Sequence, residues 1–247
     1  MPTAKEVTCT VIKKEHLTPT IIGLSFEPSK KFTYEAGQFL SIIVPKSEVL
    51  AKAVKRAYSF SSPDALSGYE LCVKHVPGGL GSSYVAALKE GDTFKAFAPY
   101  GDFRYRTSPL RAVCFVATGS GVAPFRGIAL SREFRENPPK KSLLLFGARN
   151  EEEILYRGSF EHLGIEVVHS LSKPTPFWGG HRGYVTDYLK VLPHSWNWHG
   201  TDFYICGNGA MAVEVTDFLR QARGVSANAI HSEIYFSPVR APLKKVA

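Results

Sequence analysis

A glycine-rich segment that follows an apolar run most constrains the fold of this chain. Residues 111–117 have the length and composition of a buried strand, and they lead through residues 118–124 (TGSGVAP) into a segment with a helical pattern. Backbone N–H groups converge at such a helix start, the helix dipole favours negative charge, and glycine lets a phosphate approach closely. The pattern GxGxxP lacks the last glycine of the full dinucleotide fingerprint. A tight strand–helix turn without a ligand is therefore the alternative interpretation.

The segments after this loop predict an α/β domain, because strand-like runs alternate with helix-like segments as in a parallel sheet with crossover helices. We expect strands at 111–117, 142–146, 166–170 and 202–206, and helices at 124–135, 151–161, 184–191 and 212–222.

The first hundred residues predict an antiparallel β domain, a barrel or a sandwich, because short β-rich runs alternate with Gly, Pro, Asp and Ser turns. We expect strands at 6–13, 20–26, 39–44, 55–61, 69–76 and 93–98, and one helix at 82–89. The change of pattern near 106–110 predicts one domain at residues 1–106, a second at 107–236 and a C-terminal extension at 237–247.

Composition excludes several classes of protein. The apolar runs are far shorter than the roughly 20 residues of a membrane span, and the N-terminus lacks the apolar region of a secretory signal. We therefore expect no membrane span and a cytoplasmic location.

The four cysteines lie far apart and form no CxxC pair, which predicts neither an iron–sulfur cluster nor another metal site. A redox centre would have to be a bound organic cofactor.

The net charge of +8 is compatible with nucleic acid, an acidic membrane surface or acidic partners. The basic residues are spread along the chain and no nucleic-acid-binding motif accompanies them. We expect no nucleic-acid partner, and we attribute the charge to dinucleotide phosphates and an acidic electron carrier.

Three cations follow the predicted parallel strands. Arg149 ends the second strand, where an NAD-binding domain commonly places an acidic residue, and an arginine there would suit a 2′-phosphate. Lys173 and Arg182 could complete a phosphate clamp. Alternatively, each of these cations is a solvated surface charge.

The last predicted parallel strand ends at Cys206 and Gly207. Ligands of open α/β sheets bind outside the carboxyl ends of the strands, so Cys206 lies where chemistry is expected. A buried, inert cysteine is the alternative.

In the first domain, strand alternation puts Arg56 and Tyr58 on one face and Ser59 on the other. An arginine for phosphate, a tyrosine for stacking and a serine for a ring nitrogen would suit a flavin. The loop at 77–83 repeats the helix-terminus pattern, with Ser82 or Ser83 as the N-cap. Two such loops imply two dinucleotides.

With these motifs in order, the chain resembles the ferredoxin–NADP reductase superfamily, in particular its bacterial-type members. The motifs are RAYS at 56–59, GLGS at 79–82, TGSGVAP at 118–124, CGxxxM at 206–211 and ExY at 233–235. The resemblance implies an FAD-binding antiparallel β-barrel followed by an NAD(P)-binding α/β domain. It also implies an enzyme that transfers a hydride between NADP(H) and FAD, and single electrons between FAD and a separate acidic carrier such as ferredoxin or flavodoxin.

The resemblance also implies roles for individual residues. In the first domain Arg56 would hold the FAD pyrophosphate, Tyr58 would pack on the flavin, and Ser59 would hydrogen-bond near its N5. The pyrophosphate loop would comprise Gly79, Gly81 and Ser82, and the backbone at Val73 and Lys74 would meet the ribityl or adenosine portion of FAD.

In the second domain Thr118 and Gly119 would hold the nicotinamide dinucleotide, and Cys206, followed by Gly207 and Met211 of its motif, would face the nicotinamide C4. At the C-terminus Glu233 would serve proton or electron exchange, Tyr235 would stack on the flavin, and Phe236 is a candidate for the FAD adenine.

The sequence leaves the nucleotide and the acceptor open. NADP-specific members usually read Ser-Arg where this chain has Ser172 and Lys173, and lysine offers charge without the planar fork of arginine. NAD(H) is therefore possible. The alternatives are an NADH-dependent reductase component of an oxygenase or cytochrome system, a flavin reductase, and a non-catalytic electron-transfer subunit or redox sensor.

Overall fold

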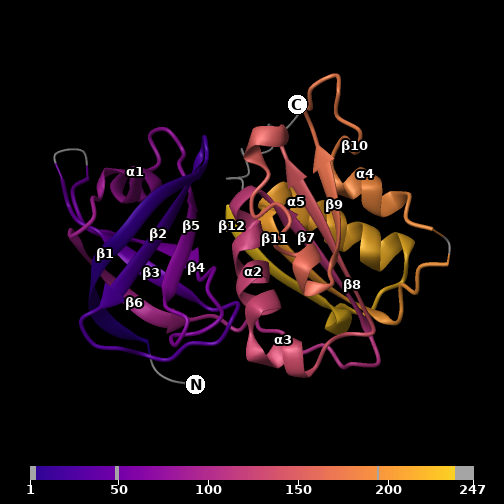
Figure 1. Ribbon diagram of the computed structural model, residues 1–247, viewed down its shortest axis with the longest axis horizontal. Helices are drawn as coiled ribbons and strands as arrows, with labels where there is room; N and C mark the ends of the chain where they lie inside the picture. The colour runs from indigo at the N-terminus through magenta and orange to yellow at the C-terminus, as the bar shows by residue number, and fades with distance from the viewer. Residues whose placement is uncertain (1–3, 48–49, 194, 237–247) are drawn as a thin grey trace, which may run out of the picture.

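The computed structural model describes residues 4–47, 50–193 and 195–236, which form two six-stranded sheets side by side (Figure 1). The first sheet is antiparallel, in the order β4-β3-β6-β1-β2-β5. The second is parallel, in the order β10-β9-β8-β7-β11-β12. The predicted fold class, an antiparallel β domain followed by a parallel α/β domain, is confirmed.

The first sheet is a closed barrel. Its elements are β1 (Lys5–Thr18), β2 (Ile21–Pro28), β3 (Phe39–Val44), β4 (Val54–Ser59), β5 (Tyr69–Lys74), α1 (Leu80–Ala87) and β6 (Thr93–Tyr100). Phe60, directly after β4, forms an antiparallel bridge with Leu71 of β5, and the Ser61 N–H donates to the Glu70 carbonyl at 2.9 Å. These contacts join the two outer strands, so that alternate side chains of every strand fill one interior.

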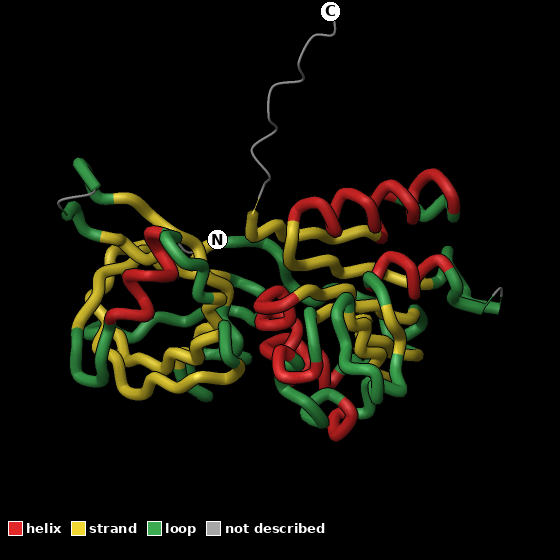
Figure 2. Tube along the Cα trace, turned by 90° about the horizontal axis from the view of Figure 1, so that it is seen from above, coloured by secondary structure: helices red, strands yellow, loops and turns green. Residues whose placement is uncertain are grey.

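The second sheet is covered on both faces (Figure 2). Its strands are β7 (Ala112–Thr118), β8 (Lys141–Ala148), β9 (Glu166–Leu171), β10 (His181–Arg182), β11 (Thr201–Asn208) and β12 (Ile230–Phe236), and its helices are α2 (Ala123–Leu130), α3 (Arg132–Glu136), α4 (Val185–Lys190) and α5 (Gly209–Asp217). In β7, Val113 and Phe115 pack in the cluster that contains α2, whereas Cys114 and Val116 pack with α4 and α5. This two-sided burial is the reason for the continuous apolar runs.

The helix predicted at 151–161 is wrong. The segment contains only two short 3-10 turns, Glu151–Glu153 and Glu161–Leu163. Tyr156 and Gly158 between them have left-handed φ angles of 53° and 77°, and Ile154 and Leu155 turn into the core. A continuous helix is incompatible with these backbone angles.

Two other details of the helices differ from expectation. The helix predicted at 124–135 is split at Ser131, whose extended backbone ends α2 and whose hydroxyl caps α3 by accepting from the Phe134 N–H at 3.2 Å. The N-cap of α1 is Gly79 rather than Ser82 or Ser83.

The short β10 and the C-terminal β12 are additional strands that the sequence patterns do not predict.

The two domains share part of their core. Ile21 and Cys72 from the barrel, and Phe103 and Tyr105 from the connecting segment, pack in the same buried cluster as α2 and β7. No helix in residues 4–47, 50–193 and 195–236 is long and apolar enough to cross a membrane.

We expect Leu40→Ala in β3 to lower the free energy of unfolding by about 2–5 kcal/mol, because Leu40 is fully buried in the barrel and its removal leaves a cavity. Urea unfolding followed by circular dichroism measures this change. The matched control is Leu66→Ala in the same domain, where the side chain is 99% exposed and a change below about 0.5 kcal/mol is expected. Equal effects of the two substitutions would contradict the assigned core.

Candidate dinucleotide and flavin site

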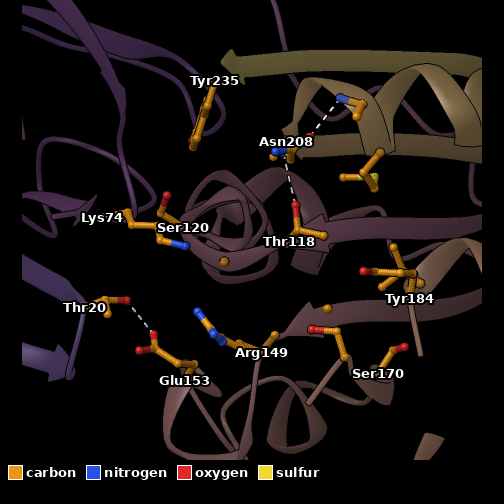
Figure 3. A pocket seen from close by; sticks show the side chains of 18 of the residues that line it. Thr20, Lys74, Thr118, Ser120, Arg149, Glu153, Ser170, Tyr184, Asn208 and Tyr235 are labelled. Atoms are coloured by element: carbon orange, nitrogen blue, oxygen red, sulfur yellow. Dashed lines mark hydrogen bonds between the residues drawn. The ribbon is translucent and has the colours of Figure 1, made fainter. Parts of the chain in front are cut away.

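A cavity of about 1000 Å³ opens at the carboxyl ends of the parallel strands, where the second domain meets the barrel. Residues that follow β7, β8, β9 and β11 line one side, and residues 20–21 and 74–77 of the barrel line the other. Figure 3 shows side chains from both domains around this space. Its position matches the rule that open α/β sheets bind ligands at this edge.

The loop after β7 and the end of β11 approach each other closely. The Thr118 hydroxyl accepts a hydrogen bond from the Asn208 N–H at 3.1 Å (Figure 3). A Cβ atom on Gly121 would overlap the Cys206 carbonyl, and one on Gly207, whose φ is 141°, would overlap the Thr118 hydroxyl. The two predicted motifs are therefore in contact, and at each of these two positions only glycine leaves room for the facing segment.

Gly119 exposes its backbone to the cavity. Its φ is 53°, and a Cβ built on it would find no atom within 4 Å, so the backbone there faces open space. Thr118, Gly119 and Ser120 all line the cavity. A phosphate could approach the amides of this loop as the sequence predicts.

The predicted cations are placed differently from one another. Arg149 points into the cavity (Figure 3). Ser172 and Lys173 also line it. Arg182 does not line it, because its Nη2 donates to the carbonyls of Thr175, Pro176 and Trp178 at 2.8–3.0 Å. Arg149 and Lys173 are thus available to an anionic ligand, whereas Arg182 holds the neighbouring loop.

Two lining residues have roles that the sequence reasoning did not predict. Tyr184, at the N-cap of α4, is 68% exposed and presents its ring to the cavity from the second domain. Lys74, expected near FAD, lines the same cavity from the barrel. An aromatic residue directly before a helix at the carboxyl edge of the sheet is the signal that could have indicated Tyr184.

The FAD-type motifs meet on the barrel. A Cβ on Gly81 of α1 would lie 2.6 Å from Cγ of Arg56 and 2.5 Å from the hydroxyl of Tyr58. The start of α1 and strand β4 therefore share one surface, as a pyrophosphate site requires. The Ser82 hydroxyl accepts from the Val76 N–H at 3.0 Å and so organises the loop before α1. Val73, in contrast, is buried in the barrel core.

Ser59 and Glu233 connect the two domains. The Ser59 hydroxyl donates to Oε1 of Glu233 at 2.6 Å, although the residues are 174 positions apart. In the β11–β12 ladder Glu233 pairs with Cys206, which is fully buried. Tyr235 lines the cavity, and its buried hydroxyl has no hydrogen-bond partner among the described residues. The side chain of Phe236 lies outside the described part of the chain.

Burial shifts the pKa values of Glu233 and Cys206, which lie next to each other in the β11–β12 ladder. It raises the pKa of Glu233, and the hydrogen bond from Ser59 opposes the shift by lowering it. Burial, reinforced by the charge of Glu233, raises the pKa of the Cys206 thiol well above its usual value. Burial thus favours the protonated form of both groups, and the Ser59 hydrogen bond opposes this only at Glu233.

The described residues fit two dinucleotides. The glycine-flanked start of α1 beside Arg56 is a cradle for one pyrophosphate, and the open backbone at Gly119 beside Arg149 is a cradle for another.

Comparison with known proteins agrees with this division. The family model described as an oxidoreductase FAD-binding domain matches residues 8–105, and the one described as an oxidoreductase NAD-binding domain matches residues 115–217. These matches define an oxidoreductase with one FAD-binding and one NAD-binding domain. The chain is 36% identical to ferredoxin–NADP reductase B of Sorangium cellulosum over 231 residues, which covers 89% of this chain and 93% of that protein. It therefore belongs to the ferredoxin–NADP reductase family.

Reductases of oxygenase systems are also similar. The phenol hydroxylase P5 protein of Acinetobacter pittii is 29% identical over 238 residues, covering 92% of this chain and 65% of that protein. The crystal structure of a cytochrome P450 reductase of Amycolatopsis superposes with a TM-score of 0.80 at 25% identity, covering 94% of this chain and 70% of that one. The family and the FAD- and NAD-binding domains predicted from sequence are thus confirmed, and the roles of individual site residues stay predictions.

We expect Ser59→Ala to raise the pKa of Glu233 further, because the hydrogen bond that lowers it is lost while the burial that raises it remains. Infrared difference spectra over about pH 4–9 would show the protonated carboxyl band persisting to higher pH than in the wild type. Glu233→Gln identifies the band by removing it. A band that titrates at the same or a lower pH in Ser59→Ala would contradict the assigned hydrogen bond.

Proposed function

We propose that this chain is a ferredoxin/flavodoxin–NADP⁺ reductase that links NADP(H), through FAD, to a separate one-electron carrier. The observation that carries the proposal is the cationic cavity that ends at Tyr235, next to the Ser59–Glu233 hydrogen bond between the domains. Of the relatives described above, the Sorangium ferredoxin–NADP reductase is the one matched over nearly its whole length.

Individual residues of the chain would have the following roles in electron transfer. FAD bound on the barrel would accept a hydride, two electrons with one proton, from NADPH, leaving NADP⁺, and would pass the electrons singly to the carrier. Arg56 and the loop at 79–82 would hold its pyrophosphate. Tyr235 would pack on the flavin, and Glu233, oriented by Ser59, would exchange protons at the site.

The charges around the cavity favour NADP(H) over NAD(H). Arg149, Lys173 and Lys74 line the cavity, whereas the carboxylate of Glu153, also in its wall, accepts hydrogen bonds from the hydroxyls of Thr18 and Thr20 at 2.9 and 2.7 Å. Glu153 is thus held at the barrel side. Glu214, which also lines the cavity, accepts a hydrogen bond from Lys190 at 2.9 Å, so the lining cations remain available for a 2′-phosphate.

An NADH-dependent reductase component of an oxygenase is the second candidate. Its support is the similarity to the phenol hydroxylase P5 protein. The chain spans about two thirds of that protein, compared with 93% of the Sorangium reductase. Nucleotide preference and acceptor together distinguish the two candidates.

The carrier is the least constrained part of the proposal. A net charge of +8 would attract an acidic ferredoxin or flavodoxin, with an association rate that falls as salt screens the charges. The cytoplasmic location expected from the sequence accords with such a partner and stays a prediction.

One experiment tests the proposal as a whole. The purified protein is expected to be yellow with bound FAD, to lose its visible absorbance on titration with NADPH at far lower concentration than with NADH, and to reduce ferredoxin or flavodoxin at a rate that falls with ionic strength. A colourless protein that gains no flavin on reconstitution would contradict the proposal. Preferential bleaching by NADH, without reduction of either carrier, would favour the oxygenase-type reductase.

We expect Arg149→Met to raise the Kd for NADPH about tenfold or more and to leave the Kd for NADH nearly unchanged, because a charge-assisted hydrogen bond to the 2′-phosphate contributes about 1.5–3 kcal/mol. Titration of the flavin spectrum with each nucleotide measures both constants. The control is Arg132→Met, which removes an 81% exposed arginine of α3. An equal loss for both nucleotides would assign Arg149 to a part that NADPH and NADH share.

A further inference from the structure

Helix α2 carries Arg126, which contacts the barrel and so connects the two candidate sites. The helix begins at Ala123, directly after the loop at 118–122, so its position determines where that loop presents its backbone to a ligand. Across the domain boundary lies segment 60–62, which directly follows Ser59 of β4. Helix α2 and this segment are in contact, and the contact is outside the cavity.

Arg126 of α2 makes the polar part of this contact. Its Nη1 donates to the Ser61 carbonyl at 2.8 Å and to Oε2 of Glu70 at 2.6 Å. Its guanidinium carbon lies 5.0 Å from the centre of the Tyr156 ring. One cation of the nucleotide-binding domain thus holds a backbone carbonyl and a carboxylate of the barrel while lying over an aromatic ring.

The backbone approach at this point is close. A Cβ on Gly127, the residue after Arg126, would lie 2.9 Å from the Ser62 carbonyl oxygen and 3.4 Å from that of Phe60. A larger side chain would push the helix away from the strand. The helix can therefore move little relative to segment 60–62 without losing the hydrogen bonds of Arg126.

Segment 60–62 is itself held firmly. The Phe60 N–H donates to the Gln38 carbonyl at 3.0 Å, and the Ser61 N–H donates to the Glu70 carbonyl at 2.9 Å. Phe60 is fully buried and separates Ser61 from Ser59 by one residue. A displacement of Ser61 would accordingly reach Ser59 and its hydrogen bond to Glu233.

Tyr156 supports the same contact from a strained backbone. Its φ of 53° lies in the left-handed region, which a bulky side chain seldom adopts. Such residues persist where their surroundings hold them, and they gather at functional sites. Here the ring packs against the shared core and under the guanidinium of Arg126.

We propose that Arg126 is a positioning residue for hydride transfer, which sets the distance between the nicotinamide held by the loop before α2 and the flavin held beside Ser59. It lines neither the cavity nor the surface shared by β4 and α1. Arginine suits this position because its planar guanidinium can lie over the Tyr156 ring while Nη1 donates to both acceptors, whereas a lysine ammonium has no plane to stack on the ring. The inference rests on the proposed function, because it takes the two cofactor sites as assigned there.

The test compares Arg126→Met with the wild type in rapid-mixing measurements of flavin reduction by NADPH. Because a displacement of about 1 Å can cost about 100-fold in rate, the limiting rate of flavin reduction should fall about 10- to 100-fold, while the Kd for NADPH and the FAD content change less than about threefold. The isotope effect with NADPH deuterated at C4 should not fall below that of the wild type, since the slowed step is the transfer. Arg126→Lys should lie between the two.

The control is Arg132→Met, which removes an equal charge from exposed α3 and should leave the limiting rate unchanged. A limiting rate for FAD-loaded Arg126→Met within about twofold of this control would overturn the proposal, even if the variant melts at a lower temperature. If Arg126→Met does not fold, a wild-type limiting rate in Arg126→Lys overturns it. A wild-type protein whose flavin NADPH cannot reduce would instead refute the proposed function.

Discussion

The rest of this structure depends on the close approach of the loop after β7 to the carboxyl end of β11. Gly121 lies against the Cys206 carbonyl and Gly207 lies against Thr118, so a side chain at either position would separate the two segments. Together they form the part of the cavity that Thr118, Gly119 and Asn208 line. The glycines of both motifs are therefore required by the packing of the protein itself, and that packing determines where the backbone amides of the loop face the cavity.

A second constraint is the place of β12 beside β11. Parallel pairing puts Glu233 opposite Cys206 and brings Tyr235 to the cavity, and Ser59 of the barrel donates to the Glu233 carboxylate. The same burial raises the pKa of both ionisable groups. It keeps the Cys206 thiol protonated and inert, and it moves the pKa of Glu233 toward neutrality. The carboxylate of Glu233 accepts its hydrogen bond from Ser59, a residue of the other domain.

Three arginines of the second domain illustrate how much depends on tertiary contacts. Arg149 points into the cavity, Arg182 donates to carbonyls of the loop at 175–178, and Arg126 crosses to the barrel. In the sequence all three follow or begin elements at the ligand-binding edge of the sheet, and nothing local separates them. Their functions differ because their acceptors differ, and those acceptors come from distant parts of the chain. The positive charges in the sequence predict an anion site, but they do not indicate which cation contacts the anion.

The amino-acid sequence by itself determined the fold class, the order of the two domains and the positions of the glycine loops. Those features follow from periodicity and turn chemistry among neighbouring residues, as in the two-sided apolar strand β7 and the glycine loop that precedes α2. Tertiary structure alone decided the features that neighbours do not specify. The segment at 151–161 has helix-forming residues, yet the burial of Ile154 and Leu155 and the left-handed Tyr156 exclude a helix. The contact between Ser59 and Glu233, and the place of Lys74 in the cavity of the other domain, depend on how the barrel packs on the sheet. That packing is set by side chains far apart in the chain, and a local pattern contains no information about them.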